Sequence, residues 1–304
     1  MAGLKQIKLK RQSVIKTRQV TRAMEAVSAV KMRKSQERAL GGRAYATGAL
    51  RILNHVTKAV GLSSHALFQE RTEGAIGLII VTSDKGLAGS LNSAVIKKVD
   101  AFLKASEHHE TEKVFICIGR RGYDYIQNRD LKVIHFEENK KDDFTEVDME
   151  RITQAVLKEY EDNALRSWEV AYTNFQSTFE QEAVTRQLLP LHTDSLEKVI
   201  AGITPKTGKY SEEEVSKKSF AFTVEPSADE ILDAIIPNLV NIFVYHTLLE
   251  TKASEHSARM VAMKNATDKA TELSHELMLK FNKARQAVIT SEVSEITSGI
   301  EAMK

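Results

Sequence analysis

The stretch that decides the fold is Asn238–Ser298, NLVNIFVYHTLLETKASEHSARMVAMKNATDKATELSHELMLKFNKARQAVITSEVSEITS, sixty-one residues without Gly or Pro. It is rich in Ala, Leu, Met, Glu, Lys and Gln, which are the residues that favour helices. The sequence therefore predicts one continuous helix of roughly 90 Å. A helix of that length exceeds the diameter of a small domain, so it needs a partner that is also elongated.

Residues that fit a helix–helix contact recur along this stretch at alternating steps of four and three, which is the spacing of a coiled-coil seam. Half of these seam residues are Ala, Ser, Thr or His rather than Leu or Ile, so the partner helix must approach closely. The predicted seam consists of Leu249, Ala253, His256, Met260, Met263, Thr267, Ala270, Ser274, Leu277, Phe281, Ala284 and Val288.

A second long helix is predicted at the other end of the chain, from Leu4 to Leu40, with a length of roughly 55 Å. Gly41-Gly42 is expected to interrupt it before a helical pattern resumes from Arg43 to Val60. Antiparallel pairing of the two terminal helices is favoured, because a compact middle region would start and finish near one point. The expected apolar stripe of the first helix is Ile7, Val14, Val20, Ala23, Met24, Val27 and Val30.

The middle of the chain, about residues 74–224, alternates apolar strands with helical stretches. This alternation favours an α/β fold with a partly parallel sheet and helices on its faces. Residues 194–218 contain Gly, Pro and an acidic run, which predicts a loop. The expected strands are 76–82, 114–118, 132–136, 168–175, 183–189 and 220–224, and the expected helices are 93–103, 122–129 and 147–160.

Positive charge is concentrated at the N-terminal end. Residues 1–40 carry a balance of +9, although the whole chain carries only +2. Coulomb attraction would bring such a helix either to nucleic acid phosphates or to an acidic protein surface, and composition leaves both open. No aromatic residue precedes Tyr45, however, so base stacking is unavailable to this helix.

Several classes of site and topology are disfavoured by the residue content. Cys117 is the only cysteine and lies in an apolar run, so we expect a buried strand thiol and no intrachain disulfide. The longest strongly apolar stretch, Ala75–Val81, is far shorter than the ~20 residues of a membrane-spanning helix. The nine His do not show the spacing of a helical zinc motif, and His108-His109 are expected at the surface.

The segment Thr82–Asn92 follows a strand and opens a helix, which is where α/β proteins bind phosphates. It matches neither the Walker pattern nor the Gly-x-Gly-x-x-Gly pattern, so a tight turn is the favoured interpretation. We expect no catalytic residue, no bound cofactor and no metal ion in this chain.

Four segments carry a resemblance to a known family: AMEAVSAVKMRKSQ at 23–36, SDKGLAGSLN at 83–92, ASEHSARMVAMKNATD at 253–268 and NKARQAVITSE at 282–292. Together they resemble the gamma subunit of the F-type, proton-translocating ATP synthase of bacterial type. The resemblance implies an antiparallel coiled coil of residues 1–60 and 229–304 beside a Rossmann-like α/β domain at 74–224. It also implies a central-stalk rotor that couples proton flow to ATP synthesis, and ATP hydrolysis to proton pumping, without being catalytic itself.

The same resemblance implies the partners and location of the chain. One copy would turn inside the hexamer of alpha and beta subunits, and would contact the epsilon subunit and the membrane c-ring. It would be a peripheral protein at the cytoplasmic face of the cell membrane. The alternative reading is a nucleic-acid-binding coiled-coil adaptor, which steeply salt-dependent binding to generic duplex DNA would reveal.

Residues for the beta-subunit contacts are carried over from the family position by position, and the residues of the foot are proposed from their place near the 194–218 loop. The first helix is expected to face acidic beta-subunit loops, and the last helix to make upper contacts with beta-subunit loops. A short strand after the 194–218 loop is expected to help form a foot on the rotor ring. These residues are Met24, Lys31, Arg33 and Lys34 on the first helix, Arg285, Gln286 and Thr290 on the last, and Phe222 and Val224 in the foot.

Overall fold

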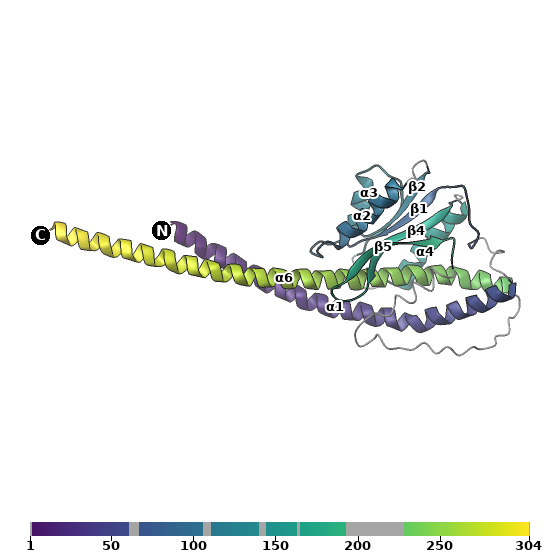
Figure 1. The fold of residues 1–304 in the computed structure, drawn as a ribbon, viewed down its shortest axis with the longest axis horizontal. Coiled ribbons are helices and arrows are strands. Elements are labelled where there is room, and N and C mark those ends of the chain that lie inside the picture. Colours follow the sequence, from purple (N-terminus) through teal and green to yellow (C-terminus); the bar gives the residue numbers. More distant parts are fainter. Residues whose placement is uncertain are drawn as a thin grey trace. The chain divides into compact units, whose positions relative to one another are not determined.

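A computed structural model describes residues 2–60, 67–105, 111–139, 144–162, 165–192 and 228–303 (Figure 1). The chain forms two compact units, one of residues 1–28 with 259–304 and one of residues 29–258. The expected strand at 220–224 and loop at 194–218 lie outside the described residues. The expected division into 1–60, 74–224 and 229–304 stays a prediction.

The helices are α1 (Ala2–Val60), α2 (Leu91–Lys104), α3 (Arg120–Gln127), α4 (Glu146–Asp162) and α6 (Ala228–Ala302). The strands are β1 (Ile76–Val81), β2 (Lys113–Ile118), β3 (Val133–Glu137), β4 (Ser167–Phe175) and β5 (Gln181–Leu189).

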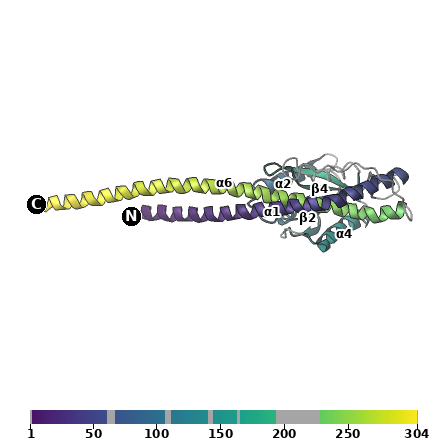
Figure 2. The same cartoon turned by 90° about the horizontal axis from the view of Figure 1, so that it is seen from below.

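In the first unit, the N-terminal part of α1 pairs with the C-terminal part of α6. The hydroxyl oxygens of Thr21 and Thr267 lie 2.7 Å apart, and Arg11 Nη2 lies 3.7 Å from Met278 Sδ. The residue number falls along α1 as it rises along α6, so the pair is antiparallel, as expected. Figure 2 shows the two helices side by side, with the end of α6 extending beyond the start of α1.

The inner row of α6 follows the predicted seam. Ala270, Ser274 and Leu277 are buried, and Phe281 and Ala284 are half-buried, while most of the residues between them are exposed. Small side chains at these positions let the two backbones approach closely, as the sequence indicated. The coiled-coil prediction for α6 is therefore confirmed.

The predicted apolar stripe of α1 is partly wrong. Ile7, Val14 and Met24 are half-buried, but Val20 and Val27 are exposed, with 58% and 55% of their surface accessible. Ala23 and Val30 are exposed too. The most buried residues at this end of α1 are instead Thr21 and Ser28, which are seven residues, or two helical turns, apart. The buried positions at this end of α1 therefore carry hydroxyl side chains, and the Thr21 hydroxyl donates a hydrogen bond to the carbonyl oxygen of Arg18 over 3.1 Å.

The expected interruption at Gly41-Gly42 is also wrong, because α1 runs unbroken from Ala2 to Val60. Glycine weakens a helix by about 1 kcal/mol relative to Ala but neither clashes nor removes a hydrogen-bond donor. The long flanking helical stretches can therefore carry the hydrogen-bond pattern through it.

The second unit contains a five-stranded sheet in the order β3-β2-β1-β4-β5. β1 runs parallel to β2 and β4, β2 runs parallel to β3, and only β5 is antiparallel to its neighbour β4. Parallel neighbours require helical crossovers, which α2, α3 and α4 provide. The expectation of a Rossmann-like, partly parallel sheet is confirmed.

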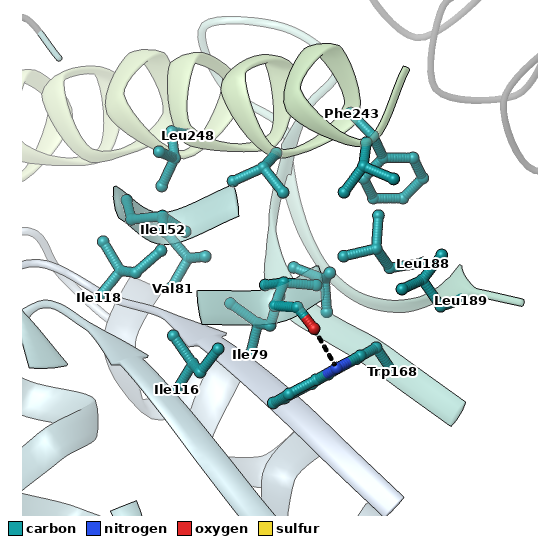
Figure 3. Close-up of a cluster of buried hydrophobic side chains, with 14 of the residues drawn as sticks. Ile79, Val81, Ile116, Ile118, Ile152, Trp168, Leu188, Leu189, Phe243 and Leu248 are labelled. Atoms are coloured by element: carbon teal, nitrogen blue, oxygen red, sulfur yellow. Dashed lines mark hydrogen bonds between the residues drawn. The ribbon is translucent and has the colours of Figure 1, made fainter. Parts of the chain in front are cut away.

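Side chains of β1 alternate between two apolar cores. Leu78 and Ile80 pack with α2 and α3, whereas Ile79 and Val81 pack with α4 and the first part of α6. A strand that is buried on both faces has a continuous apolar sequence, which is why this stretch could be predicted. Figure 3 shows the second of these cores, where Phe243 of α6 points toward the sheet.

Trp168 and Gly77 are cross-strand partners in this sheet. A Cβ atom on Gly77 would lie 2.2 Å from Cε3 of Trp168, so the indole ring occupies the space that a side chain would need. The indole Nε1 donates a hydrogen bond to the carbonyl oxygen of Val156, over 3.1 Å (Figure 3). A buried Trp is thus fully satisfied between β1 and α4.

Candidate partner interface

The basic residues expected to meet a partner lie on α1. Lys31 is half-buried, and Arg33 and Lys34 are exposed. At 100° per residue, Lys31 and Lys34 share one side of α1, while Arg33 lies about 200° around the helix from Lys31. The positive charge therefore lies on two sides of this part of α1.

An exposed row of apolar residues, Val20, Ala23 and Val27, accompanies Met24 on α1. Their spacing of three and four places them on one face of the helix. Sequence reasoning assigned this face to the coiled coil, because valines are more apolar than the Thr and Ser residues that occupy the seam. We call these three residues the outer row of α1.

The three distal residues, Arg285, Gln286 and Thr290, are all exposed. Since Thr21 lies opposite Thr267, and Arg11 lies near Met278, the same register places Arg285 opposite the first turn of α1. The last turns of α6 therefore continue past the end of their partner helix, and residues 289–303 are exposed throughout.

This unpaired end of α6 carries an apolar stripe that sequence reasoning missed. Its residues have between 50% and 90% of their surface exposed. They recur at steps of four, three, four and three, so they share one face, and this spacing was a readable signal. The stripe, here called the distal row, consists of Ile289, Val293, Ile296, Ile300 and Met303.

The turn at Thr82–Asn92 is held by its own side chains. Ser83 Oγ and Asn92 Nδ2 are 2.8 Å apart, and the backbone N–H of Ser83 donates to Asn92 Oδ1. Asp84 Oδ1 accepts from the backbone N–H of Arg120 over 2.7 Å, which places a carboxylate at the start of α3. The expected tight turn is what this segment forms.

A stretch of α6 in the second unit, residues 246–257, is buried on every side although it is rich in polar residues. Burial raises the pKa of Glu250 to about 7, and the charge of Arg186 and the Tyr172 hydroxyl counteract this only in part. Burial also lowers the pKa of His246 to about 4. Both groups are therefore driven toward their neutral forms.

Other expected sites receive no structural description. Phe222 and Val224 of the expected foot, and His108-His109, lie outside the described residues. Within the described ranges, His, Cys, Asp and Glu side chains form no group of three or more that could hold a metal ion. In the same part of the chain, no helix combines the length and hydropathy that crossing a bilayer requires.

Known proteins similar to this chain in sequence share one description. Residues 3–303 match a family model described as ATP synthase. The chain is 35% identical to the ATP synthase gamma chain of Psychrobacter sp. (strain PRwf-1) over 303 residues, which is 100% of both chains. It is 37% identical to the ATP synthase gamma chain of Cupriavidus necator over 306 residues, again 100% of both.

Two solved structures with the same fold come from mitochondrial ATP synthases. One is a chain of the Euglena gracilis OSCP/F1/c-ring structure, with a TM-score of 0.64 and 16% identity over 99% of this chain and 95% of that one. Another is from the Tetrahymena thermophila central stalk/c-ring structure, with a TM-score of 0.53 and 22% identity over 81% of this chain and 99% of that one.

Proposed function

This chain belongs to the ATP synthase gamma chain family, and on that premise we propose which of its surfaces perform the work of a rotor. The chain is a non-catalytic subunit of the central stalk. It turns inside the hexamer of alpha and beta subunits and couples proton flow through the membrane sector to ATP synthesis. Its partners are those subunits, the epsilon subunit and the c-ring, with one copy in each complex.

The observation that carries the proposal is the end of α6, where the helix extends beyond the start of α1 and exposes the distal row. Exposed apolar stripes mark contact sites, because leaving them in water is unfavourable. An apolar surface on the partner would cover this row without forming directional bonds. Such a contact slides easily, because rotation exchanges one apolar neighbour for another of similar energy.

The surfaces of α1 provide a different kind of contact. Lys31, Arg33 and Lys34 offer charge to acidic loops of the beta subunits, and Met24 with the outer row offers apolar area beside them. Exposed ion pairs are worth only about 0–1 kcal/mol each, so they can break and re-form on each turn. Arg285, Gln286 and Thr290 are the polar contacts beside the distal row.

The remaining assignments complete this proposal. Phe222 and Val224 belong to the foot on the rotor ring, and the chain acts at the cytoplasmic face of the membrane. It binds no cofactor of its own, which the internally bonded turn at Thr82–Asn92 supports. The lack of aromatic residues before Tyr45 argues against a nucleic acid partner for α1.

The proposal is tested by reconstituting the chain with alpha and beta subunits from the same organism. The isolated chain is expected to hydrolyse no ATP, and the assembled complex is expected to do so. Arg285→Ala should lower turnover of the complex several-fold, in line with the loss of a charged contact. Lys283→Ala, an exposed cation two residues away on α6, is the matched control. Equal turnover in both variants would remove Arg285 from the interface, and failure to assemble would refute the proposed function.

A further inference from the structure

The buried stretch of α6 departs from the usual pattern of a helix inside a protein. A helix that is buried all round is normally apolar on every face. Lys252, Ser254 and Ser257 nevertheless have 2% or less of their surface exposed. Burying polar groups is costly unless each finds a partner, so the partners of these three residues are informative.

Two of the partners lie in the β4–β5 hairpin and not in α6 itself. Ser254 Oγ donates to the carbonyl oxygen of Thr173 in β4 over 3.3 Å. Ser257 Oγ donates to the carbonyl oxygen of Thr178, in the turn between β4 and β5, over 2.6 Å. Gln181 Nε2 reaches the same Thr178 oxygen over 2.9 Å, so this turn is held from two sides.

Other hydroxyl groups of α6 form hydrogen bonds within their own helix. Thr247, Thr267 and Thr271 donate to carbonyl oxygens four residues earlier in their own helix. Local bonds of this kind satisfy a hydroxyl wherever the helix is placed. Ser254 and Ser257 had the same option, and their bonds to the sheet therefore report on how α6 is seated.

The hydrogen bond of Lys252 lies on the side of α6 opposite to that of Ser254. Lys252 Nζ donates to the carbonyl oxygen of Asn139, just after β3, over 2.7 Å. At 100° per residue, Lys252 lies about 200° around the helix from Ser254 and about 140° from Ser257. Asn241, eleven residues before Lys252 and thus on its side of α6, accepts a hydrogen bond from Thr153 of α4 over 3.3 Å.

Bonds on opposite sides of a helix resist its rotation in either direction. Apolar contacts alone are non-directional, whereas a hydrogen bond weakens steeply when its angle changes. We propose that Lys252, Ser254 and Ser257 are positioning residues that lock the angular setting of α6 against the sheet. Under the proposed function, this lock makes the sheet and α6 turn as one body under torque. The lock itself does not depend on that function.

The isolated full-length chain tests the lock directly. Spin labels at Asn238→Cys on α6 and Glu182→Cys on β5, both exposed positions, report the distance between helix and sheet. Cys117 is buried, and burial raises the pKa of its thiol to about 12, so it should remain unlabelled. In K252M/S254A/S257A we expect the distance distribution to widen about twofold, because the directional bonds are gone.

Matched controls separate the lock from a general effect of substitution. Lys269→Met and Thr271→Ala change the same kinds of side chain at exposed positions of α6, and they should leave the distribution unchanged. If the triple variant does not fold, S257A alone removes a single hydroxyl and should widen the distribution to a smaller extent. If circular dichroism shows that a variant is folded and its distance distribution equals that of the parent, the proposal is overturned.

The assembled complex tests the consequence for torque. With the hexamer immobilised and a bead attached at Glu182→Cys, S254A/S257A should raise the variance of the bead angle about twofold while ATP turnover stays the same. A purely structural defect would lower turnover or assembly instead. Unchanged variance would overturn the role in torque. If the chain failed to assemble, the proposed function would fail, and the spin-label result would still decide whether the lock exists.

Discussion

Two regions of the same helix invert the usual rule of burial in opposite ways. Residues 246–257 of α6 place Ser, Thr, Glu, Lys and His inside the second unit, whereas the distal row places Ile and Val in solvent. The first region holds position through directional bonds within the chain. The second leaves apolar area available to other chains. Under the proposed function, the comparison teaches that polarity along this helix follows the kind of contact each part makes, fixed in one case and sliding in the other.

The largest expected effect comes from removing apolar volume inside the buried stretch. Leu249 has 1% of its surface exposed and packs in the core between the sheet and α6. Leu249→Ala should lower the free energy of unfolding by about 2–5 kcal/mol, since it removes buried methyl groups and leaves a cavity. Urea denaturation of the isolated chain measures this loss.

Leu279→Ala is the matched control for that experiment, because Leu279 lies on the same helix with 58% of its surface exposed. It should change the free energy of unfolding by no more than about 0.5 kcal/mol. Similar losses in the two variants would contradict the contrast between the regions.

A smaller and pH-dependent effect is expected at Glu250, whose folded pKa of about 7 lies above the ordinary value of 4.5. The folded chain holds this proton more tightly than the unfolded chain, so the contribution of Glu250 to stability is present below pH 4.5 and lost as the pH rises through 7. Glu250→Gln should therefore stabilise the chain by about 1–3 kcal/mol at pH 8 and by much less at pH 4.5.

Thermal unfolding of both proteins across this pH range measures the difference. His246, with a folded pKa lowered to about 4, acts in the opposite sense, because its contribution to the stability of the chain is lost as the pH falls from 6.5 to 4. His246 is present in both the parent chain and Glu250→Gln, so the difference between their stabilities reports on Glu250 alone. Glu301→Gln, the same substitution at an exposed position of α6, is the matched control. A pH-independent gain in Glu250→Gln would show that Glu250 is not buried as an acid.

The smallest effect on stability is expected in the distal row. Ile296 is 63% exposed, so Ile296→Ala should leave the free energy of unfolding of the isolated chain within about 0.5 kcal/mol of the parent. The assembled complex should respond more strongly, with weaker retention of the chain on the hexamer, because the apolar contact is made there. A stability loss in the isolated chain without any change in the complex would reverse the roles of the two regions.

Much of this fold could be predicted from local signals. The buried strands appear as continuous apolar runs, and the seam of α6 follows its spacing through Ala270 and Ser274. The face of α1 could not be predicted by hydropathy, because close packing against α6 favours Thr21 and Ser28 over Val20 and Val27. There, hydroxyl side chains became buried although they are less apolar than the exposed valines.

The candidate surfaces divide in the same way. The distal row has a helical spacing that can be read from the sequence alone, although it was missed. The partners of Ser254 and Ser257 could not be read, because a serine in a helix bonds its own backbone unless a tertiary neighbour offers a carbonyl group. Those neighbours, Thr173 and Thr178, lie about eighty residues away in the chain.

The contact between Gly77 and Trp168 also bears on how this sequence can drift over time. Neither position can enlarge or shrink independently without a penalty, since one ring fills the volume that the other residue leaves vacant. A lineage that replaced the tryptophan by a smaller residue would open room for a side chain at position 77. As long as that side chain remained, a tryptophan at position 168 would clash with it. Substitutions at these two positions in the sheet therefore depend on the order in which they occur.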